Sequence, residues 1–159
     1  MFDIFKRKKI FEWKRGEKTS LKKFLDSVGR SCNITEQVVF NRREESISLN
    51  DALWSVCNEY VLKNMRSGNT MNIRYLYYQM EKMLVSEGKN ANKIVKKRLY
   101  NVLQDYKKQG IPIVIPVCTN DCCEACKKIN GKEFSINDAI KKQPLAPKNC
   151  TCQRCTCQY

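Results

Sequence analysis

Residues 117–159 read VCTNDCCEACKKINGKEFSINDAIKKQPLAPKNCTCQRCTCQY. This segment holds eight of the ten cysteines of the chain: Cys118, Cys122, Cys123, Cys126, Cys150, Cys152, Cys155 and Cys157. Two CxxC pairs stand near its two ends, Cys123 with Cys126 and Cys152 with Cys155. A CxxC turn holds two thiolates at adjacent corners of a coordination tetrahedron, so two such turns complete a four-thiolate metal site. The spacing therefore predicts a Cys-rich metal-binding module.

The sequence leaves the exact ligand set open. Cys118 or Cys122 could replace Cys123, Cys150 or Cys157 could replace either downstream ligand, and eight thiolates could also hold two ions. We expect one or two Zn²⁺ ions, with an iron–sulfur cluster as the alternative metal. A reduced, metal-free cluster and disulfides in an exported protein are the alternatives to a metal site. The main predicted ligands are Cys123, Cys126, Cys150, Cys152, Cys155 and Cys157, with Cys118 and Cys122 as further candidates.

Turn and capping signals lie between the two cysteine groups. Asn130-Gly131 is typical of a type I′ turn and predicts a hairpin that pairs residues 128–129 with 132–134. Ser135 and Asp138 have the spacing of a helix cap and predict a short helix over residues 136–142.

The amino-acid composition limits the chemistry of this module. The chain has no histidine, which excludes Ser-His and Cys-His nucleophiles and histidine-ligated zinc enzymes. A closed all-thiolate shell leaves no open position for water, so we expect a structural metal and lean towards a non-enzymatic protein without a small-molecule substrate. The start of the chain lacks the basic-then-apolar order of a signal peptide, which favours a cytoplasmic protein of a bacterial cell, where thiols stay reduced.

Upstream of the module, apolar residues recur at helical spacing. They predict a short helix that starts at Thr19 or Ser20 and three longer helices over about 50–67, 70–87 and 92–109, joined by short loops as in a bundle. Cys32 and Cys57 stand alone and are expected to be small buried side chains. Residues 31–48 suggest an irregular linker or short strand, and residues 111–117 an edge strand.

These segments predict a mainly α protein, with a helical bundle followed by a small α+β zinc-knuckle module. The expected division is a basic tail over 1–18, a helical domain over 19–110 and the Cys-rich module over 111–159. The tail mixes bulky apolar and basic residues; we favour a loosely packed start over a segment that docks on a membrane or a partner.

The net charge of +14 suggests an anionic partner. Basic residues crowd the third long helix without compensating acids, which is unfavourable unless an anion is bound. If the partner is DNA or RNA, we expect this helix to contact it through Lys93, Lys96, Lys97, Arg98, Lys107 and Lys108; the alternative is that these charges form only a solvated face.

The Cys-rich segment resembles a known family motif. Asp121-Cys122-Cys123-Glu124-Ala125-Cys126, then Asn130 to Phe134, then Pro144 to Cys152, is similar to the C-terminal motif of phage Mu-type minor head, or head-morphogenesis, proteins. Residues 98–110 also resemble the helix that precedes that motif.

The resemblance marks Cys123, Cys126, Cys150 and Cys152 as the motif cysteines. The family's histidine falls near Pro147 here, so Cys155 or Cys157 would supply the missing ligand. The resemblance implies a phage- or prophage-type zinc-binding interaction protein with a protein partner of phage or host origin. The alternative is a basic zinc protein that binds nucleic acid without sequence preference.

Overall fold

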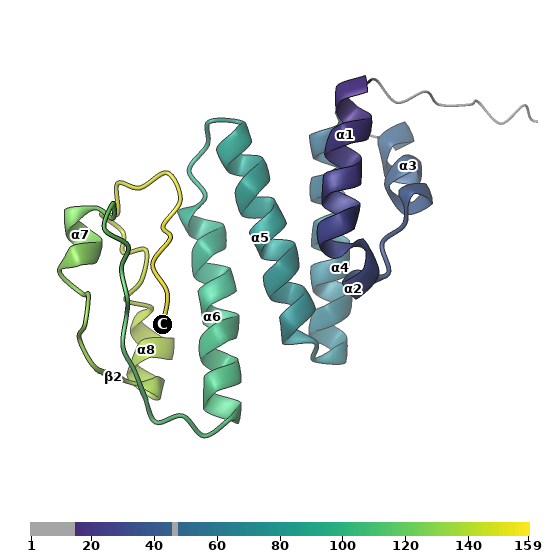
Figure 1. The fold of residues 1–159 in the computed structure, drawn as a ribbon. Coiled ribbons are helices and arrows are strands. Elements are labelled where there is room, and N and C mark those ends of the chain that lie inside the picture. The colour runs from purple at the N-terminus through teal and green to yellow at the C-terminus, as the bar shows by residue number, and fades with distance from the viewer. Residues whose placement is uncertain (1–14, 46–47) are drawn as a thin grey trace, which may run out of the picture.

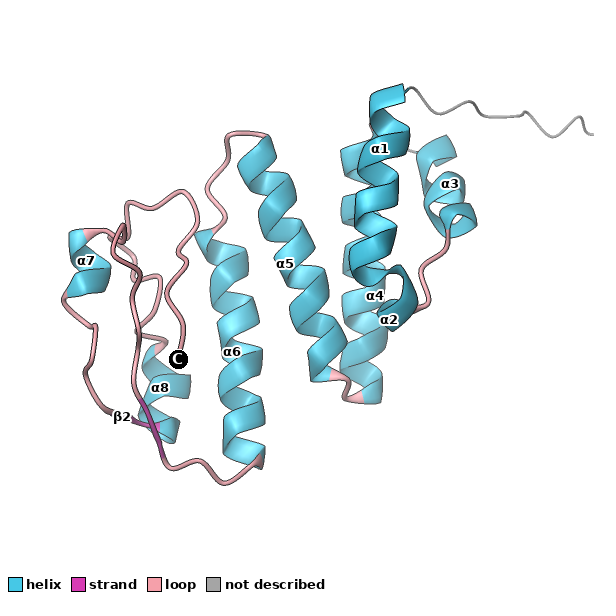
Figure 2. Ribbon diagram, viewed as in Figure 1, coloured by secondary structure: helices cyan, strands magenta, loops and turns pink. Residues whose placement is uncertain are grey.

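The structure is a computed structural model that describes residues 15–45 and 48–159, so the predicted tail lies outside the described residues up to residue 14. It is mainly helical, with one small sheet near the C-terminal end (Figure 2). In chain order the elements are α1 (Arg15–Phe24), the π-helical turn η1 (Leu25–Gly29), α2 (Arg30–Cys32), α3 (Glu36–Glu45), α4 (Leu49–Ser67), α5 (Thr70–Ser86), α6 (Asn92–Lys108), β1 (Ile113–Val114), α7 (Glu124–Lys127), β2 (Phe134–Ser135) and α8 (Ile136–Lys142). The predicted fold class, a helical bundle with a small Cys-rich module, is confirmed.

Helices α4, α5 and α6 form the predicted run of long amphipathic helices. Ser48 accepts a hydrogen bond from the Asp51 N–H at 3.1 Å, and Asn69 accepts one from the Asn72 N–H at 3.1 Å. Helices α4 and α5 therefore begin at Leu49 and Thr70, within one residue of the predicted starts. Gly68 ends α4 with a φ of +70°, a conformation that favours glycine. The helices therefore begin and end where local capping chemistry dictates.

The predicted linker or strand over residues 31–48 is wrong where the structure describes it, because α3 occupies most of that segment. Val38 and Val39 have a local preference for strand, but packing overrides it. Val39 is fully buried in the core that α1 and α3 share with α4, and Arg42 on α3 forms an ion pair with Glu59 on α4.

The strands of the module also pair differently from the prediction. β1 pairs antiparallel with β2, with Val114 opposite Phe134, instead of residues 128–129 pairing with 132–134. The Asn130-Gly131 turn is present with a Gly131 φ of +73°, but its Asn130 Oδ1 accepts from the Cys118 N–H at 2.9 Å. The turn is thus hydrogen-bonded to the segment at Cys118, and β2 pairs with β1 instead of with residues 128–129. The predicted helix α8 is confirmed, with Ser135 as its cap.

Helix α6 lies between the rest of the bundle and the Cys-rich module (Figure 1). Ile94 joins the bundle core, whereas Val95 and Leu99 pack with cysteines of the module. Leu103 packs with Val114 and α8 in a third small core. Helix α6 therefore contributes side chains both to the core of the bundle and to the core of the Cys-rich module. In the described ranges, no helix combines the length and the apolar character that crossing a bilayer requires.

Candidate metal centre

Seven of the eight predicted cysteine ligands pack in one cluster with Val95 and Leu99 of α6, and Cys152 joins them through its contacts with Cys123 and Cys150. Cys118 follows β1, Cys122 and Cys123 precede α7, and Cys126 lies within α7. The other four come from the segment after α8, which runs back alongside α6 (Figure 1). Segments that are distant in sequence thus bring their sulfurs together, and we call this cluster the metal centre.

The first sulfur group consists of Cys123, Cys126, Cys150 and Cys152. The Cys150 Sγ lies 3.7 Å from the Cys123 Sγ and 3.6 Å from the Cys126 Sγ, and all three sulfurs lie within 4.8 Å of one another. The Cys152 thiol is in hydrogen-bond contact with both Cys123 and Cys150. These four cysteines are the ones that the family resemblance marks.

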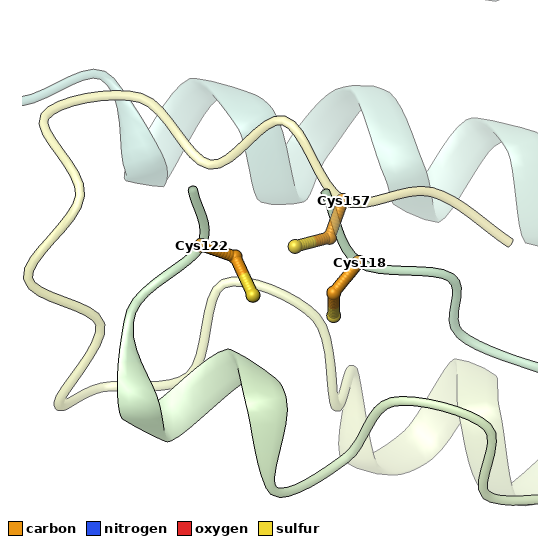
Figure 3. A group of neighbouring side chains, drawn as sticks. All are labelled: Cys118, Cys122 and Cys157. Atoms are coloured by element: carbon orange, nitrogen blue, oxygen red, sulfur yellow. The ribbon is translucent and has the colours of Figure 1, made fainter. Parts of the chain in front are cut away.

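The second sulfur group consists of Cys118, Cys122, Cys155 and Cys157. The side chains of Cys118, Cys122 and Cys157 converge, with sulfurs within 4.8 Å of one another (Figure 3). Cys155 is fully buried and in hydrogen-bond contact with the Cys157 thiol. The two lower-ranked candidates, Cys118 and Cys122, therefore belong to the centre as fully as the main ones.

The two sulfur groups adjoin at Cys126. Its Sγ lies 3.7 Å from the Cys155 Sγ, and Cys126, Cys155 and Cys157 form a third trio with sulfurs within 4.8 Å. Cys126 is fully buried between the groups. A change at this position is therefore expected to disturb both groups.

Backbone N–H groups point at several of the sulfurs. Burial raises the pKa of the Cys123 thiol, but hydrogen bonds from the N–H groups of Cys126 and Thr151 and from neighbouring thiols outweigh it and lower the pKa to about 5. Burial raises the pKa of Cys152 and of Cys157 to about 11. Cys123 is thus ready to bind a cation as a thiolate, whereas the more buried thiols need a metal to displace their protons.

The chemistry of this donor set suits a metal ion. Sulfur is the only ligand type in either group, and four thiolates complete a tetrahedral shell. The cluster can therefore hold metal, and a filled shell leaves no coordination position for a substrate.

The N-terminal turn of α6 fixes the loop that carries the last cysteines. Asn92 Oδ1 accepts from the Cys155 N–H at 2.8 Å, and Asn92 Nδ2 donates to the Cys152 carbonyl at 2.7 Å. The Ala91 N–H donates to the Gln153 carbonyl at 2.8 Å. The predicted helix over about 92–109 begins at Asn92, but nothing in the sequence indicated that this residue holds the cysteine loop.

A buried carboxylate holds the same loop from the other side. Glu81 on α5 is fully buried and accepts from Arg98 Nε at 2.6 Å and from Arg154 Nε at 2.9 Å. Arg154 also lies over the Tyr78 ring, 4.8 Å from its centroid. The prediction that Arg98 contacts nucleic acid is not supported by this geometry, because its guanidinium is engaged inside the protein. No sequence signal distinguished Glu81 from an exposed helical glutamate.

The remaining predicted nucleic-acid residues divide between two places on α6. Lys93, Lys96 and Lys97 lie near its start, where they line a surface hollow, and Lys107 and Lys108 are exposed at its end. Outside the centre, Cys32 and Cys57 are buried in the bundle core as expected, and burial raises their pKa to about 11 and about 12.

Comparisons of the chain with protein-family models, curated proteins and solved structures found no match. The resemblance to head-morphogenesis proteins therefore stays a prediction.

Proposed function

We propose that the protein is a non-enzymatic zinc-binding interaction protein of phage or prophage type, related to head-morphogenesis proteins. Two Zn²⁺ ions, each in one four-sulfur group, would hold its C-terminal module on α6. The observation that carries the proposal is the convergence of seven sulfurs in overlapping trios, with the Cys152 thiol in hydrogen-bond contact with two of them. Zinc is the metal that favours four thiolates in a tetrahedron, and it adds no redox chemistry to the site.

The grouping of the cysteines supports the family relation. The four motif cysteines share one group and complete its four-sulfur shell without the missing histidine. Cys155 and Cys157, the two residues expected to replace that histidine, lie together in the second group. The family pattern thus accounts for one site, and the second site is an addition in this chain.

An exposed apolar row supports the role of a protein partner. Ile113, Ile115 and Val117 alternate along β1 and the segment that follows it, and they are 50%, 43% and 62% exposed. Alternate residues of an extended segment share one face, so these side chains form a continuous apolar row. Such a row beside a rigid metal-held module is a suitable surface for a protein partner.

Metal analysis tests the proposal. We expect the protein, purified without chelators, to contain two zinc ions per chain and no iron. Cys126→Ser should lose at least one zinc, because Cys126 touches both groups. Cys57→Ala, a buried cysteine of the bundle, is the control and should keep both ions. Absence of zinc, iron in its place, or full zinc content in Cys126→Ser would each contradict the proposal.

A further inference from the structure

Beyond the metal-held module, the surface of α6 carries a second feature that the proposed function leaves unused. Five residues recur at helical spacing on one face of α6 and line a hollow of about 500 Å³: Lys93, Lys96, Lys97, Tyr100 and Asn101. Met65 and Tyr77 from the bundle and Gln143 after α8 complete it. The hollow therefore lies where three parts of the chain meet, and its size is in the range of sites that take small organic groups.

The charge of this hollow is positive and uncompensated. Among the described residues, none of the ion pairs involves Lys93, Lys96 or Lys97, and no acidic side chain lines the hollow. The acids closest along α5 and α6 are engaged elsewhere, Glu81 with two arginines and Asp105 with Arg74. Three like charges at helical spacing repel one another, so a bound polyanion would relieve them.

The other lining groups suit a nucleobase. The Tyr100 ring is 39% exposed at the edge of the hollow, and the buried Tyr77 ring lies below Lys97, whose Nζ is 6.0 Å from the ring centroid. Aromatic rings beside lysines are the usual means by which proteins bind single strands, since bases stack on the ring while lysines contact phosphates. Asn101 and Gln143 add amides that can hydrogen-bond to base edges.

We infer that this hollow, which we call the α6 groove, binds single-stranded nucleic acid. Lys93, Lys96 and Lys97 contact phosphates, and Tyr100 stacks on a base. Duplex DNA keeps its bases inside and cannot use Tyr100, so the groove prefers a single strand. An acidic peptide would satisfy the lysines but would not need the ring.

Binding of a fluorescent twelve-nucleotide oligothymidylate to the full zinc-loaded chain tests the inference. With about three phosphate contacts, the slope of log affinity against log salt is about −2, so affinity falls roughly twentyfold between 50 and 200 mM salt. Lys93→Gln/Lys96→Gln/Lys97→Gln should remove most of this salt dependence. Tyr100→Leu keeps the apolar bulk but loses stacking and should weaken binding about fivefold or more.

The matched control is Lys18→Gln/Lys22→Gln/Lys23→Gln, which removes the same charge from exposed lysines of α1, a helix that contributes no residue to the groove. The control should bind nearly as the native protein does, and zinc content and circular dichroism should show that every variant is folded.

Several results would overturn the inference: no binding at low salt, equal losses in the triple variant and the control, or unchanged binding in Tyr100→Leu. Tighter binding of a matching duplex would remove the single-strand preference. Equal or tighter binding of a polyglutamate peptide would point to an acidic protein partner instead.

Discussion

The carboxylate of Glu81 is buried between two arginines that come from different parts of the chain. Arg98 belongs to α6, whereas Arg154 lies in the loop between Cys152 and Cys155. Removing one partner of a buried ion pair leaves charge without compensation inside the protein. At the scale of single residues, Glu81 therefore ties the metal centre to the bundle.

Glu81→Gln should lower the free energy of unfolding by about 3 kcal/mol, because it leaves the two guanidinium groups facing a neutral amide. Urea denaturation followed by circular dichroism measures the change. Glu59→Gln is the control, since Glu59 pairs with Arg42 at the surface, where both side chains are more than a third exposed. The control should lose less than about 1 kcal/mol, and equal losses in the two variants would contradict the role of Glu81.

At the scale of elements, the first turn of α6 positions the loop that carries Cys152 and Cys155. Asn92→Ala removes the hydrogen bonds to Cys152 and Cys155 without touching a sulfur. Groups that orient metal ligands typically change metal affinity by about 10- to 100-fold, and we expect a loss in that range. A competition titration with a chromophoric chelator measures it.

Asn101→Ala is the control for this titration. Asn101 lies on the same helix, and its amide donates to the Lys97 carbonyl on the exposed side. It should leave zinc affinity unchanged. If Asn92→Ala also binds zinc as tightly as the native protein, the loop holds its geometry without help from α6.

The sequence predicted the elements whose signals are local. Helices α4, α5, α6 and α8 follow from apolar periodicity and capping residues, and the cysteine cluster follows from ligand spacing. Helix α3 did not, because the strand preference of Val38 and Val39 is outweighed by packing on α4. The partner of β2 could not be predicted, because the Asn130-Gly131 turn binds Cys118 from outside the turn.

The sequence also could not predict the site residues whose partners are distant in the chain. Glu81 and Arg154 are 73 positions apart, and neither carries a motif. The division of eight cysteines into two groups depends on how the last segment folds over α7, which spacing alone leaves open. Arg98 looked like its neighbouring lysines in sequence, and only the position of Glu81 separates it from them.

At the scale of the whole molecule, metal removal should affect the two sides of α6 differently. Zinc binding and folding of a small thiolate module are coupled, so a strong chelator should unfold residues 111–159. The bundle core has its own buried residues from α1 to α5 and should keep most of the helical signal. Circular dichroism with limited trypsin digestion and mass spectrometry measures both effects.

Trypsin should then cut first within 111–159, because unfolding frees the backbone beside lysines such as Lys127 and Lys141, whose side chains are already exposed in the folded module. Adding zinc under reducing conditions should restore the original digestion pattern. Unchanged digestion after complete metal removal would mean that the module is stable without its ions.

The position of α6 also has a consequence for protein synthesis. On the ribosome, α6 emerges before the segments that cover its outer face, so Val95, Leu99 and Leu103 stay exposed until the cysteine segments follow. A polypeptide that ends near Gly110 would leave this apolar face of α6 exposed to solvent. Residue 110 is thus a poor end point for an expression fragment, although the helical domain was predicted to end there. We expect such a fragment to aggregate or to be degraded by cellular proteases.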